Sequence, residues 1–364
     1  MSASPHPIEA VSQRLERFVQ EMRVESAEMG PEAAALVDAG AAALTGGKRL
    51  RARFCFAGWR AVSSARGADP ASSDAVVSAG AALEIFHAAA LVHDDVIDNS
   101  DTRRGGPAAH RALEALHRDA GWAGNAGSFG RSAAILLGDL LVAWSDDLFE
   151  QGLESRDAAT AAAARRQYAL MRRDVTIGQF LDIAEESAFV TEPDDRHAER
   201  ALRVASLKSA RYSVQQPLLI GASLAAADPA QLEALRAFGH PVGLAFQLRD
   251  DVLGVFGDES VTGKPSGDDL REGKRTVLVA LTREGLPTSA RRVVDELIGD
   301  PTLDSEQIAS LQRTIIDTGA LHRVEELISS YAHEADRALS GARLDNAAVG
   351  ELRDLARAAT ARTS

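Results

Sequence analysis

The sequence predicts an all-α protein, and three observations support this. Alanine, leucine, arginine and glutamate dominate the 364 residues, aromatic residues make up only 5%, and alternating runs of β-branched residues are scarce. The 45% of hydrophobic residues suffice for a large buried core. Because neither a long linker nor a repeat at a fixed period interrupts the chain, we expect one domain over residues 1–364, with disordered tails at about 1–10 and 358–364.

Helix-favouring segments follow one another along the chain, and stretches rich in Gly, Pro and Ser separate them. In the first half we expect helices at Pro7–Glu28, Pro31–Ala43, Leu50–Ser63, Ser73–Asn99, Ala108–Ala120, Phe129–Gln151 and Ser155–Ser187. In the second half we expect helices at His197–Ala225, Pro229–Val255, Lys274–Arg283, Ser289–Leu297, Ser305–Thr318 and Leu321–Leu339, and one more near the C-terminus. Helical proteins build ligand sites between facing helices, so polar groups on apolar helices mark the candidate site.

Charge and cysteine content exclude several classes of protein. A formal charge of −13 argues against a nucleic-acid partner, because such proteins need a broad basic face to displace counterions from phosphate. The single cysteine, Cys55, lies between apolar residues and is expected to be a buried thiol, which leaves no disulfide framework and no cysteine metal site. We find no run of about eighteen apolar residues and no basic, apolar leader, so we expect a cytoplasmic protein without stable membrane insertion.

The stretch HDDVIDNSDTRRGG, residues 93–106, changes abruptly from acidic to basic. It ends an apolar helix, where the macrodipole disfavours carboxylates unless a cation offsets them. Asp94 and Asp98 share one helix face, with about 5 to 6 Å between their Cβ atoms, and oxygen ligands of this kind suit Mg²⁺. Arg103 and Arg104 follow as anion-binding groups. Although a lone cluster of this kind often is a solvated helix end, carboxylates for a metal beside arginines for oxyanions favour a diphosphate site.

A second stretch repeats this arrangement. The apolar helix that includes PVGLAFQLRDD ends in Asp250 and Asp251, and a Gly-rich loop with Lys264 and Lys274 follows. If the two helices face each other across a cavity, the two clusters together can hold a metal-bound diphosphate.

With both clusters in view, the sequence resembles the trans-isoprenyl diphosphate synthases, also called polyprenyl synthetases. The resemblance extends over residues 40–345, and its motifs occur in the family's order: GGKRLR at 46–51, DDVID with RR at 94–104, GQFLD at 178–182, KSA at 208–210, and QLRDDVLGVFGD at 247–258 with TGKPSGDD and EGKRT. The resemblance implies a single all-α domain around a deep central cavity, usually a homodimer, and Mg²⁺-dependent condensation of isopentenyl diphosphate with an allylic diphosphate.

The resemblance also implies a role for each matching residue. Three Mg²⁺ ions are expected at Asp94, Asp98 and Asp250, with Asp251 acting through water. Transition-state charge is expected to be stabilised by Arg103, Lys208 and Lys264, and the allylic cation by Gln179, Gln247 and Ser209. Isopentenyl diphosphate is expected at Lys48, Arg51, His87 and Arg104. Lys274, in the loop after the second cluster, is also expected to bind substrate. Gly254 stands where a third aspartate often completes that cluster.

Product length should depend on the residues before Asp94, because the growing chain runs down that helix. Short-product enzymes of the family place bulky aromatics at the positions that Ala89 and Ala90 occupy here. Phe86 is the next candidate for a floor, which predicts a product of about twenty carbons, geranylgeranyl diphosphate. If Phe86 packs away from the cavity, longer products of twenty-five carbons or more follow. A terpene cyclase and a non-catalytic subunit of a heteromeric synthase are the remaining alternatives, but neither typically keeps both aspartate clusters and the basic GGKRLR motif.

Overall fold

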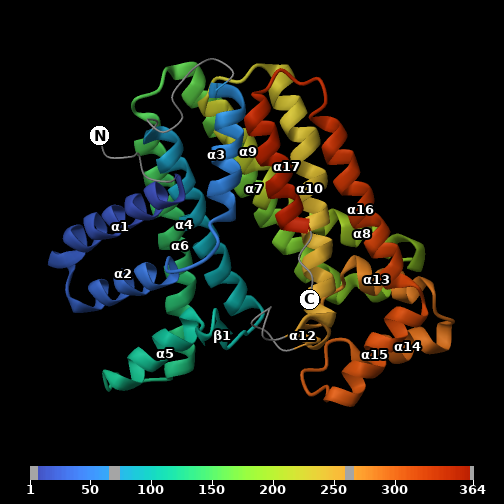
Figure 1. Ribbon diagram of the computed structural model, residues 1–364. Coiled ribbons are helices and arrows are strands. Elements are labelled where there is room, and N and C mark those ends of the chain that lie inside the picture. The colour runs from blue at the N-terminus through green and yellow to red at the C-terminus, as the bar shows by residue number, and fades with distance from the viewer. Residues whose placement is uncertain (1–6, 65–73, 259–265, 361–364) are drawn as a thin grey trace.

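The computed structural model describes residues 7–64, 74–258 and 266–360, and within them the chain is a bundle of helices (Figure 1). The predicted all-α class is confirmed. The N-terminal half contains α1 (Pro7–Ser26), η1 (Ala27–Met29), α2 (Pro31–Ala43), α3 (Leu50–Ser63), α4 (Asp74–Ile97), β1 (Thr102–Arg103), β2 (Gly106–Pro107), α5 (Ala109–Asp119), α6 (Ala126–Leu153) and α7 (Ala158–Ala188).

The C-terminal half continues with η4 (Phe189–Thr191), η5 (Asp194–Arg196), α8 (His197–Val204), η6 (Ala205–Gln215), α9 (Gln216–Leu224), α10 (Pro229–Phe256), α12 (Asp268–Glu272), α13 (Val277–Glu284), α14 (Thr288–Leu297), α15 (Ser305–Asp317), α16 (Ala320–Ala338) and α17 (Asn346–Thr360). Helix α1 begins at Pro7 and α17 ends at Thr360, so residues 7–10 and 358–360 of the expected tails are helical. The antiparallel pair β1–β2 has two residues in each strand and was not expected.

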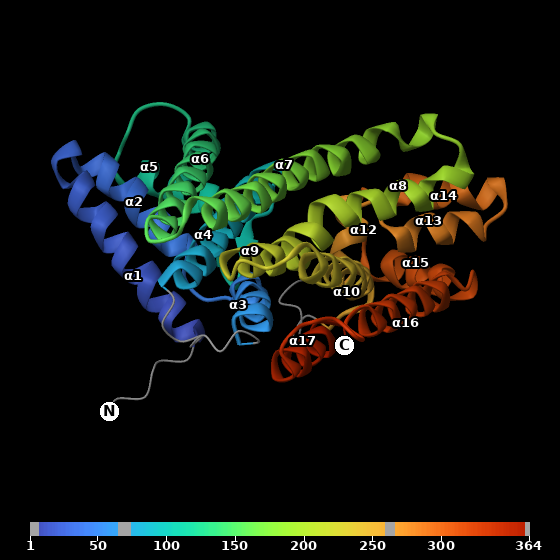
Figure 2. The same cartoon turned by 90° about the horizontal axis from the view of Figure 1, so that it is seen from above.

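Two large buried clusters form the core, and the long helices α10 and α16 contribute to both. The larger cluster joins α1, α3, α4, α6 and α9, and the smaller joins α10 to α12, α13, α15 and α16. Helix α4 packs along α6 and α10 packs along α16, on opposite sides of the bundle (Figures 1 and 2). The C-terminal ends of α4 and α10, where the aspartates lie, are therefore at the same end of the molecule.

The segment predicted as one helix over 197–225 contains a π-helix, η6, between α8 and α9. Pro217 has no backbone N–H and cannot donate the hydrogen bond that a continuous α-helix needs there. Two glycines let neighbouring helices approach this segment: a Cβ on Gly178 of α7 would overlap the backbone N of Lys208, and a Cβ on Gly243 of α10 would overlap the carbonyl of Ala210. The π-helix is thereby fixed between α7 and α10. Such segments are frequent at functional sites.

Within the described residues, α4 and α6 are long and apolar enough to cross a membrane by length and composition alone. In α4, 78% of the apolar stretch is buried inside the protein, as in the core helix of a soluble protein, whereas in α6 only 28% is buried. Helix α6 therefore presents apolar side chains on the outside of the bundle.

Candidate active site

The first aspartate cluster lies at the C-terminal end of α4, and its members have different surroundings. Asp94 accepts a hydrogen bond of 2.9 Å from the amide of Gln179 on α7. Asp95 is only 2% exposed and pairs with Arg103, whose Nε donates to Asp95 Oδ1 over 2.9 Å. Arg103, expected to bind diphosphate, thus also anchors the loop after α4 to the helix. Asp94 and Asp98 remain on the face that looks toward the site.

Lys208 lies on η6 beside the first cluster. Its Nζ is 2.5 Å from Asp182 Oδ2 and 3.6 Å from Asp94 Oδ1. Burial lowers the pKa of Lys208, but the charges of Asp94 and Asp182 outweigh it and raise the pKa, so the amine stays protonated. The predicted residues Gln179, Lys208 and Asp94 are therefore brought together from three helices. Ser209 follows Lys208 on the same π-helix.

The second cluster lies at the C-terminal end of α10. Asp251 is buried and accepts a hydrogen bond of 2.7 Å from Gln247, one turn earlier. Burial and the nearby charge of Asp269 raise the pKa of Asp251 to about 8. Gln247, expected to soften the allylic cation, is thus committed in part to this carboxyl. Asp250 precedes Asp251 on the same helix end.

Lys274 completes the second cluster from the loop between α12 and α13. The helix expected from Lys274 begins only at Val277, because Thr276 caps it by accepting from the Val279 N–H over 3.4 Å. This correction leaves Lys274 in the loop, where it reaches Asp269, 3.4 Å from Nζ, and Glu272. The charges of these carboxylates outweigh burial and raise the pKa of Lys274 well above its usual value. Lys264 lies outside the described residues.

The charges of the two clusters act on each other across the site. Burial and the charge of Asp94 raise the pKa of Asp98 to about 7, while Lys274 and Lys208 partly offset this rise. Lys208, which pairs with Asp94, and Lys274, which pairs with Asp269, are therefore both close enough for their charges to act on Asp98. Among residues 7–64, 74–258 and 266–360, no three carboxylate, imidazole or thiol side chains converge closely enough to hold a metal ion on their own. The oxygen-only donors fit Mg²⁺, which commonly completes its coordination shell with water and substrate phosphate.

A second group of cations surrounds His87 on α4. Burial lowers the pKa of His87 well below its usual value, and so do the charges of four arginines, which we call the arginine cluster: Arg51, Arg104, Arg103 and Arg49. Several guanidinium groups around one neutral imidazole make an anion-binding site that needs no metal.

The GGKRLR loop forms the wall of this anion site. Arg104 donates a hydrogen bond of 2.5 Å to the carbonyl of Thr45, and a Cβ on Gly47 would lie 3.1 Å from its Nη2. Gly47 also has a φ of +87°, so glycine suits this position both because it leaves room for Arg104 and because it adopts this backbone conformation without strain. The predicted members Arg51, His87 and Arg104 are brought together, whereas the Lys48 side chain is exposed beside them.

Tyr212 on η6 was not predicted, and it contacts three predicted residues. Its hydroxyl lies 3.1 Å from His87 Nδ1, the guanidinium of Arg51 lies 4.1 Å from its ring centroid, and the ring of Phe86 packs edge-on against it. Arg51 also donates to the hydroxyl of Ser213 over 2.8 Å. Ala90 and Phe86 lie four and eight residues before Asp94 and share its helix face, while Ala89 is fully buried.

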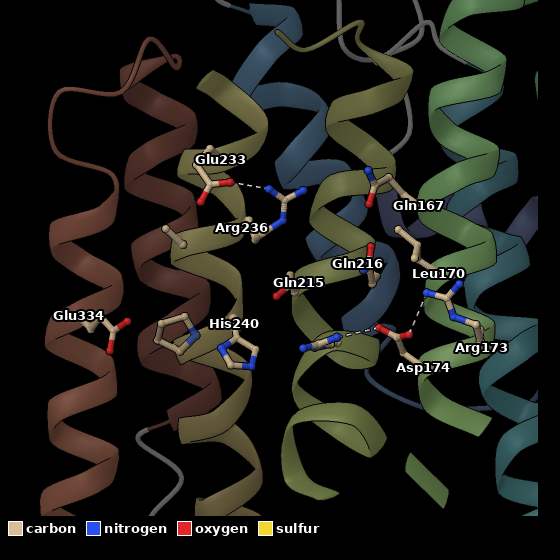
Figure 3. Close-up of a pocket in the computed structure, with 13 residues that line it drawn as sticks. Gln167, Leu170, Arg173, Asp174, Gln215, Gln216, Glu233, Arg236, His240 and Glu334 are labelled. Carbon is tan, nitrogen blue, oxygen red and sulfur yellow. Dashed lines mark hydrogen bonds and ion pairs between the residues drawn. The ribbon is translucent and has the colours of Figure 1, made fainter. Parts of the chain in front are cut away.

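A separate polar pocket with a volume of 480 Å³ lies behind η6 (Figure 3). Gln167 and Asp174 of α7, Gln216 of α9 and His240 of α10 contribute to its lining. Arg211 of η6 donates to Asp174 across it over 2.9 Å. None of the predicted site residues lines this pocket.

Comparison with known proteins decides the family. Residues 34–315 match the family model for polyprenyl synthetase. The chain belongs to the polyprenyl synthetase family. This confirms the resemblance seen in the motifs, and the aspartates, Lys208 and the arginine cluster of this synthetase all lie within the matched region.

Several relatives of this polyprenyl synthetase have names that specify a product. It is 37% identical over 242 residues to a geranylgeranyl diphosphate synthase of Mycobacterium tuberculosis, covering 66% of this chain and 60% of that one. It is 31% identical over 299 residues to a geranylfarnesyl diphosphate synthase of Aeropyrum pernix, covering 81% and 83%. The chain spans 64%, 63% and 60% of the length of three curated relatives, from Sulfolobus acidocaldarius, Methanocaldococcus jannaschii and M. tuberculosis.

The fold of this synthetase is also that of solved structures. A geranylgeranyl pyrophosphate synthase of Corynebacterium glutamicum, complexed with isoprenyl diphosphate and magnesium, superposes with a TM-score of 0.90. The two sequences are 38% identical, and the match covers 100% of both chains.

Proposed function

We propose that this synthetase condenses isopentenyl diphosphate with allylic diphosphates and releases geranylgeranyl diphosphate. One observation carries the proposal: Lys208 pairs with Asp94 of the first cluster, Lys274 pairs with Asp269, which lies against Gly254 of α10, and the arginine cluster forms a second anion site around His87. One anion site combines carboxylates for Mg²⁺ with lysines, and the other consists of arginines alone. This difference suits two diphosphate substrates, because only the allylic substrate must lose its diphosphate. The C. glutamicum synthase holds magnesium together with isoprenyl diphosphate in its crystal structure, which supports the same assignment.

The aspartates Asp94, Asp98 and Asp250 would hold three Mg²⁺ ions with the allylic diphosphate, and Asp251 would act through a bound water. When bound, Mg²⁺ neutralises the charge that develops on diphosphate as its carbon–oxygen bond breaks. Burial, and next to it the charges of neighbouring carboxylates, raise the pKa values of Asp98 and Asp251, and a divalent cation would stabilise both groups in the ionised form.

The side chains of the protein then assist ionisation and protect the cation. Diphosphate leaves with the electron pair of the carbon–oxygen bond and gains negative charge as the bond breaks. Lys208 donates to it, so the positive charge of Lys208 stabilises the transition state more than the ground state. The amide oxygens of Gln179 and Gln247 and the hydroxyl of Ser209 face the allylic cation without trapping it. Water must be kept out until the cation has reacted.

Isopentenyl diphosphate binds at Arg51 and Arg104 of the arginine cluster, with His87 and Lys48. Its double bond attacks C1 of the allylic cation and forms the new carbon–carbon bond. The new bond leaves a positive charge on C3 of the isopentenyl unit, and loss of a proton from its C2 to the released diphosphate gives a trans double bond and an allylic diphosphate five carbons longer. Phe86, buried and eight residues before Asp94, is proposed as the floor that stops growth at about twenty carbons.

The test is incubation of the purified protein with Mg²⁺, isopentenyl diphosphate and each of the dimethylallyl, geranyl and farnesyl primers, with product length read by mass spectrometry. A geranylgeranyl product supports the chemistry and the floor. Longer chains would keep the chemistry and remove the floor, an outcome that the A. pernix relative makes the leading alternative. A cyclised hydrocarbon would indicate a terpene cyclase, and no product at all would indicate a subunit of a heteromeric synthase.

We further propose that the enzyme is a homodimer in the cytoplasm. Apolar side chains of α6 and α7 are exposed: Ile135 47%, Leu136 61%, Ile177 46%, Phe180 67% and Ile183 39%. The ion pairs Asp146–Arg172 and Glu150–Arg165 join α6 to α7 in antiparallel order. A second copy of the chain is the partner that exposed apolar side chains on these two helices fit. The proposed cytoplasmic location is supported by α4. It is the more apolar of the two helices that are long enough to cross a membrane, and most of its apolar stretch is buried in the core.

A further inference from the structure

The polar pocket behind η6 has no part in the proposed reaction, and its lining comes from α7, η6, α9, α10 and α16 (Figure 3). Its volume of 480 Å³ lies within the range of about 300–1,000 Å³ that small-molecule sites occupy. Of its thirteen lining residues, only Leu170, Ala237 and Pro241 are apolar. A prenyl tail would leave the other lining groups without hydrogen bonds, so a ligand of this pocket must be polar.

Two glutamines of the pocket have unused capacity for hydrogen bonds. Gln167 of α7 and Gln216 of α9 are 7% and 3% exposed, and the Oε1 atom of each has no hydrogen-bond partner among the residues that the structure describes. Because a buried polar group without a partner is costly, a ligand that donates to these atoms gains affinity. An amide can also turn over and present its NH₂ group in the same place. A hydroxyl suits both orientations, since it donates and accepts.

The charged side chains of the pocket balance one another. The lining holds three arginines and three acidic residues: Arg173, Arg211, Arg236, Asp174, Glu233 and Glu334. Arg211 donates to Asp174 over 2.9 Å, and Arg236 donates to Glu233. Burial and the charge of Arg211 lower the pKa of His240, so its imidazole adds no charge near pH 7. A charged ligand would have to compete with these pairs, whereas a neutral ligand can accept from the further N–H groups that each guanidinium carries.

The pocket adjoins the active site through η6. Arg211 and Gln215 of this π-helix line the pocket, while Lys208 and Tyr212 of the same π-helix contact residues of the active site. We propose that the pocket is a second ligand site, for a small neutral polyhydroxylated molecule, and that the bound molecule stiffens the π-helix. The proposal does not depend on the condensation reaction, because none of the predicted site residues lines the pocket.

The experiment measures binding by calorimetry with neutral probes: glycerol, myo-inositol, glucose and trehalose. Inorganic phosphate and glycine serve as the anionic and the dipolar probe. Gln167→Leu and Gln216→Leu remove the amides with little change in size, and Ala237→Phe fills the pocket from an exposed position on α10. Ser223→Ala is the matched control, because it also removes an unpartnered buried polar atom from α9, but Ser223 does not line the pocket.

At least one neutral probe is expected to bind with a Kd on the order of 1 mM, and each glutamine variant should weaken that binding at least about tenfold. Ala237→Phe should abolish binding, and Ser223→Ala should match the wild type. The glutamine variants should melt no lower than the wild type, because an apolar side chain replaces an unpaired buried amide. This result separates a loss of binding from a loss of fold. In the wild type, the bound probe should slow hydrogen exchange of the η6 amides, measured by mass spectrometry.

Three results would overturn the proposal. The first is that no neutral probe binds, or that binding persists in the glutamine variants and in Ala237→Phe. The second is that inorganic phosphate or glycine binds in place of the neutral probes, which would refute the class of ligand. The third is binding that leaves hydrogen exchange in η6 unchanged, which would refute the stiffening. Neither measurement needs turnover, so a protein that binds a neutral probe but makes no prenyl product would refute the proposed function alone.

Discussion

The ring of Phe86 packs edge-on against the ring of Tyr212, with 5.9 Å between the ring centroids. This contact joins α4 to the π-helix about two turns before Asp94, at the position where we propose that the growing chain ends. Replacing Phe86 with alanine is expected to lengthen the main product beyond twenty carbons, because a turn of helix and an isoprene unit are both roughly 5.4 Å long. Mass spectrometry of the products checks this, and an unchanged distribution would remove Phe86 as the floor.

A loss of stability must be separated from this change in length. Truncating a buried phenylalanine costs about 3–5 kcal/mol. Phe56 on α3 has the same exposed fraction as Phe86, 6%, and serves as the control. Phe56→Ala should lower the melting temperature to a similar extent and leave the product unchanged. Ala90→Phe, which places a bulky ring one turn before Asp94, is expected to shorten the product.

Tyr212 is expected to act on isopentenyl diphosphate binding through His87. Tyr212→Phe removes the hydroxyl 3.1 Å from His87 Nδ1 but keeps the ring beneath Arg51. A hydrogen bond of this kind contributes about 0.5–1.5 kcal/mol, so the KM for isopentenyl diphosphate should rise about two- to tenfold with kcat nearly unchanged. Tyr168→Phe is the matched control, because its buried hydroxyl pairs with Ser145 outside the site. An equal rise in the KM for the allylic substrate would contradict the assignment.

The pH dependence of stability follows from the raised pKa values of Asp98 and Asp251, about 7 and about 8. In the unfolded chain both groups have a pKa of about 3.9. At a pH between this value and the raised pKa values, the folded protein therefore binds more protons than the unfolded chain. The free energy of unfolding of the metal-free protein should therefore fall as the pH rises from about 4 to about 8, by at most about 1.4 kcal/mol per group and pH unit.

Thermal unfolding in EDTA between pH 5.5 and 9 tests this dependence. Asp251→Asn should flatten the curve, whereas Asp300→Asn should not, because hydrogen bonds from Thr302 lower the pKa of that exposed carboxyl. Mg²⁺ with pyrophosphate should stabilise the protein more at high pH than at low pH, since metal ligands must be deprotonated. A melting temperature that rises with pH in EDTA would contradict the sign.

Local sequence patterns were enough to predict most of the helices and to single out the two aspartate clusters. The i, i+4 spacing of Asp94 and Asp98, and the second apolar helix that ends in Asp250 and Asp251, can both be seen within a short stretch of sequence. The π-helix was missed because most of its cause is tertiary. The backbones of α7 and α10 approach it closely at Gly178 and Gly243, and only Pro217 is a cause that the local sequence contains. A helix pattern in the sequence does not distinguish a wider turn from an ordinary one.

The sequence did not reveal Tyr212 and Asp269 as neighbours of the site, and the cause is the same for both. Tyr212 meets His87 from 125 residues further along the chain, and Asp269 meets Gly254 from a different helix, so neither forms a spacing pattern with its partner. Asp182 belongs to the GQFLD motif, but only its contact with Lys208 distinguishes it from a residue on an ordinary helix face.

The apolar face of α6 and α7 leads to the last prediction. The wild type is expected to sediment at twice the chain mass of 38.5 kDa, because a stable dimer buries about 1,200–2,000 Å² and this face offers five large apolar side chains. Leu136→Asp places a charge in the middle of the face and should shift the protein toward monomer by at least about tenfold in Kd, since an unpaired buried charge is costly. Val293→Asp is the control, because Val293 is 56% exposed on α14, away from this face. A monomeric wild type, or a dimer that Leu136→Asp leaves intact, would place the contact between copies elsewhere.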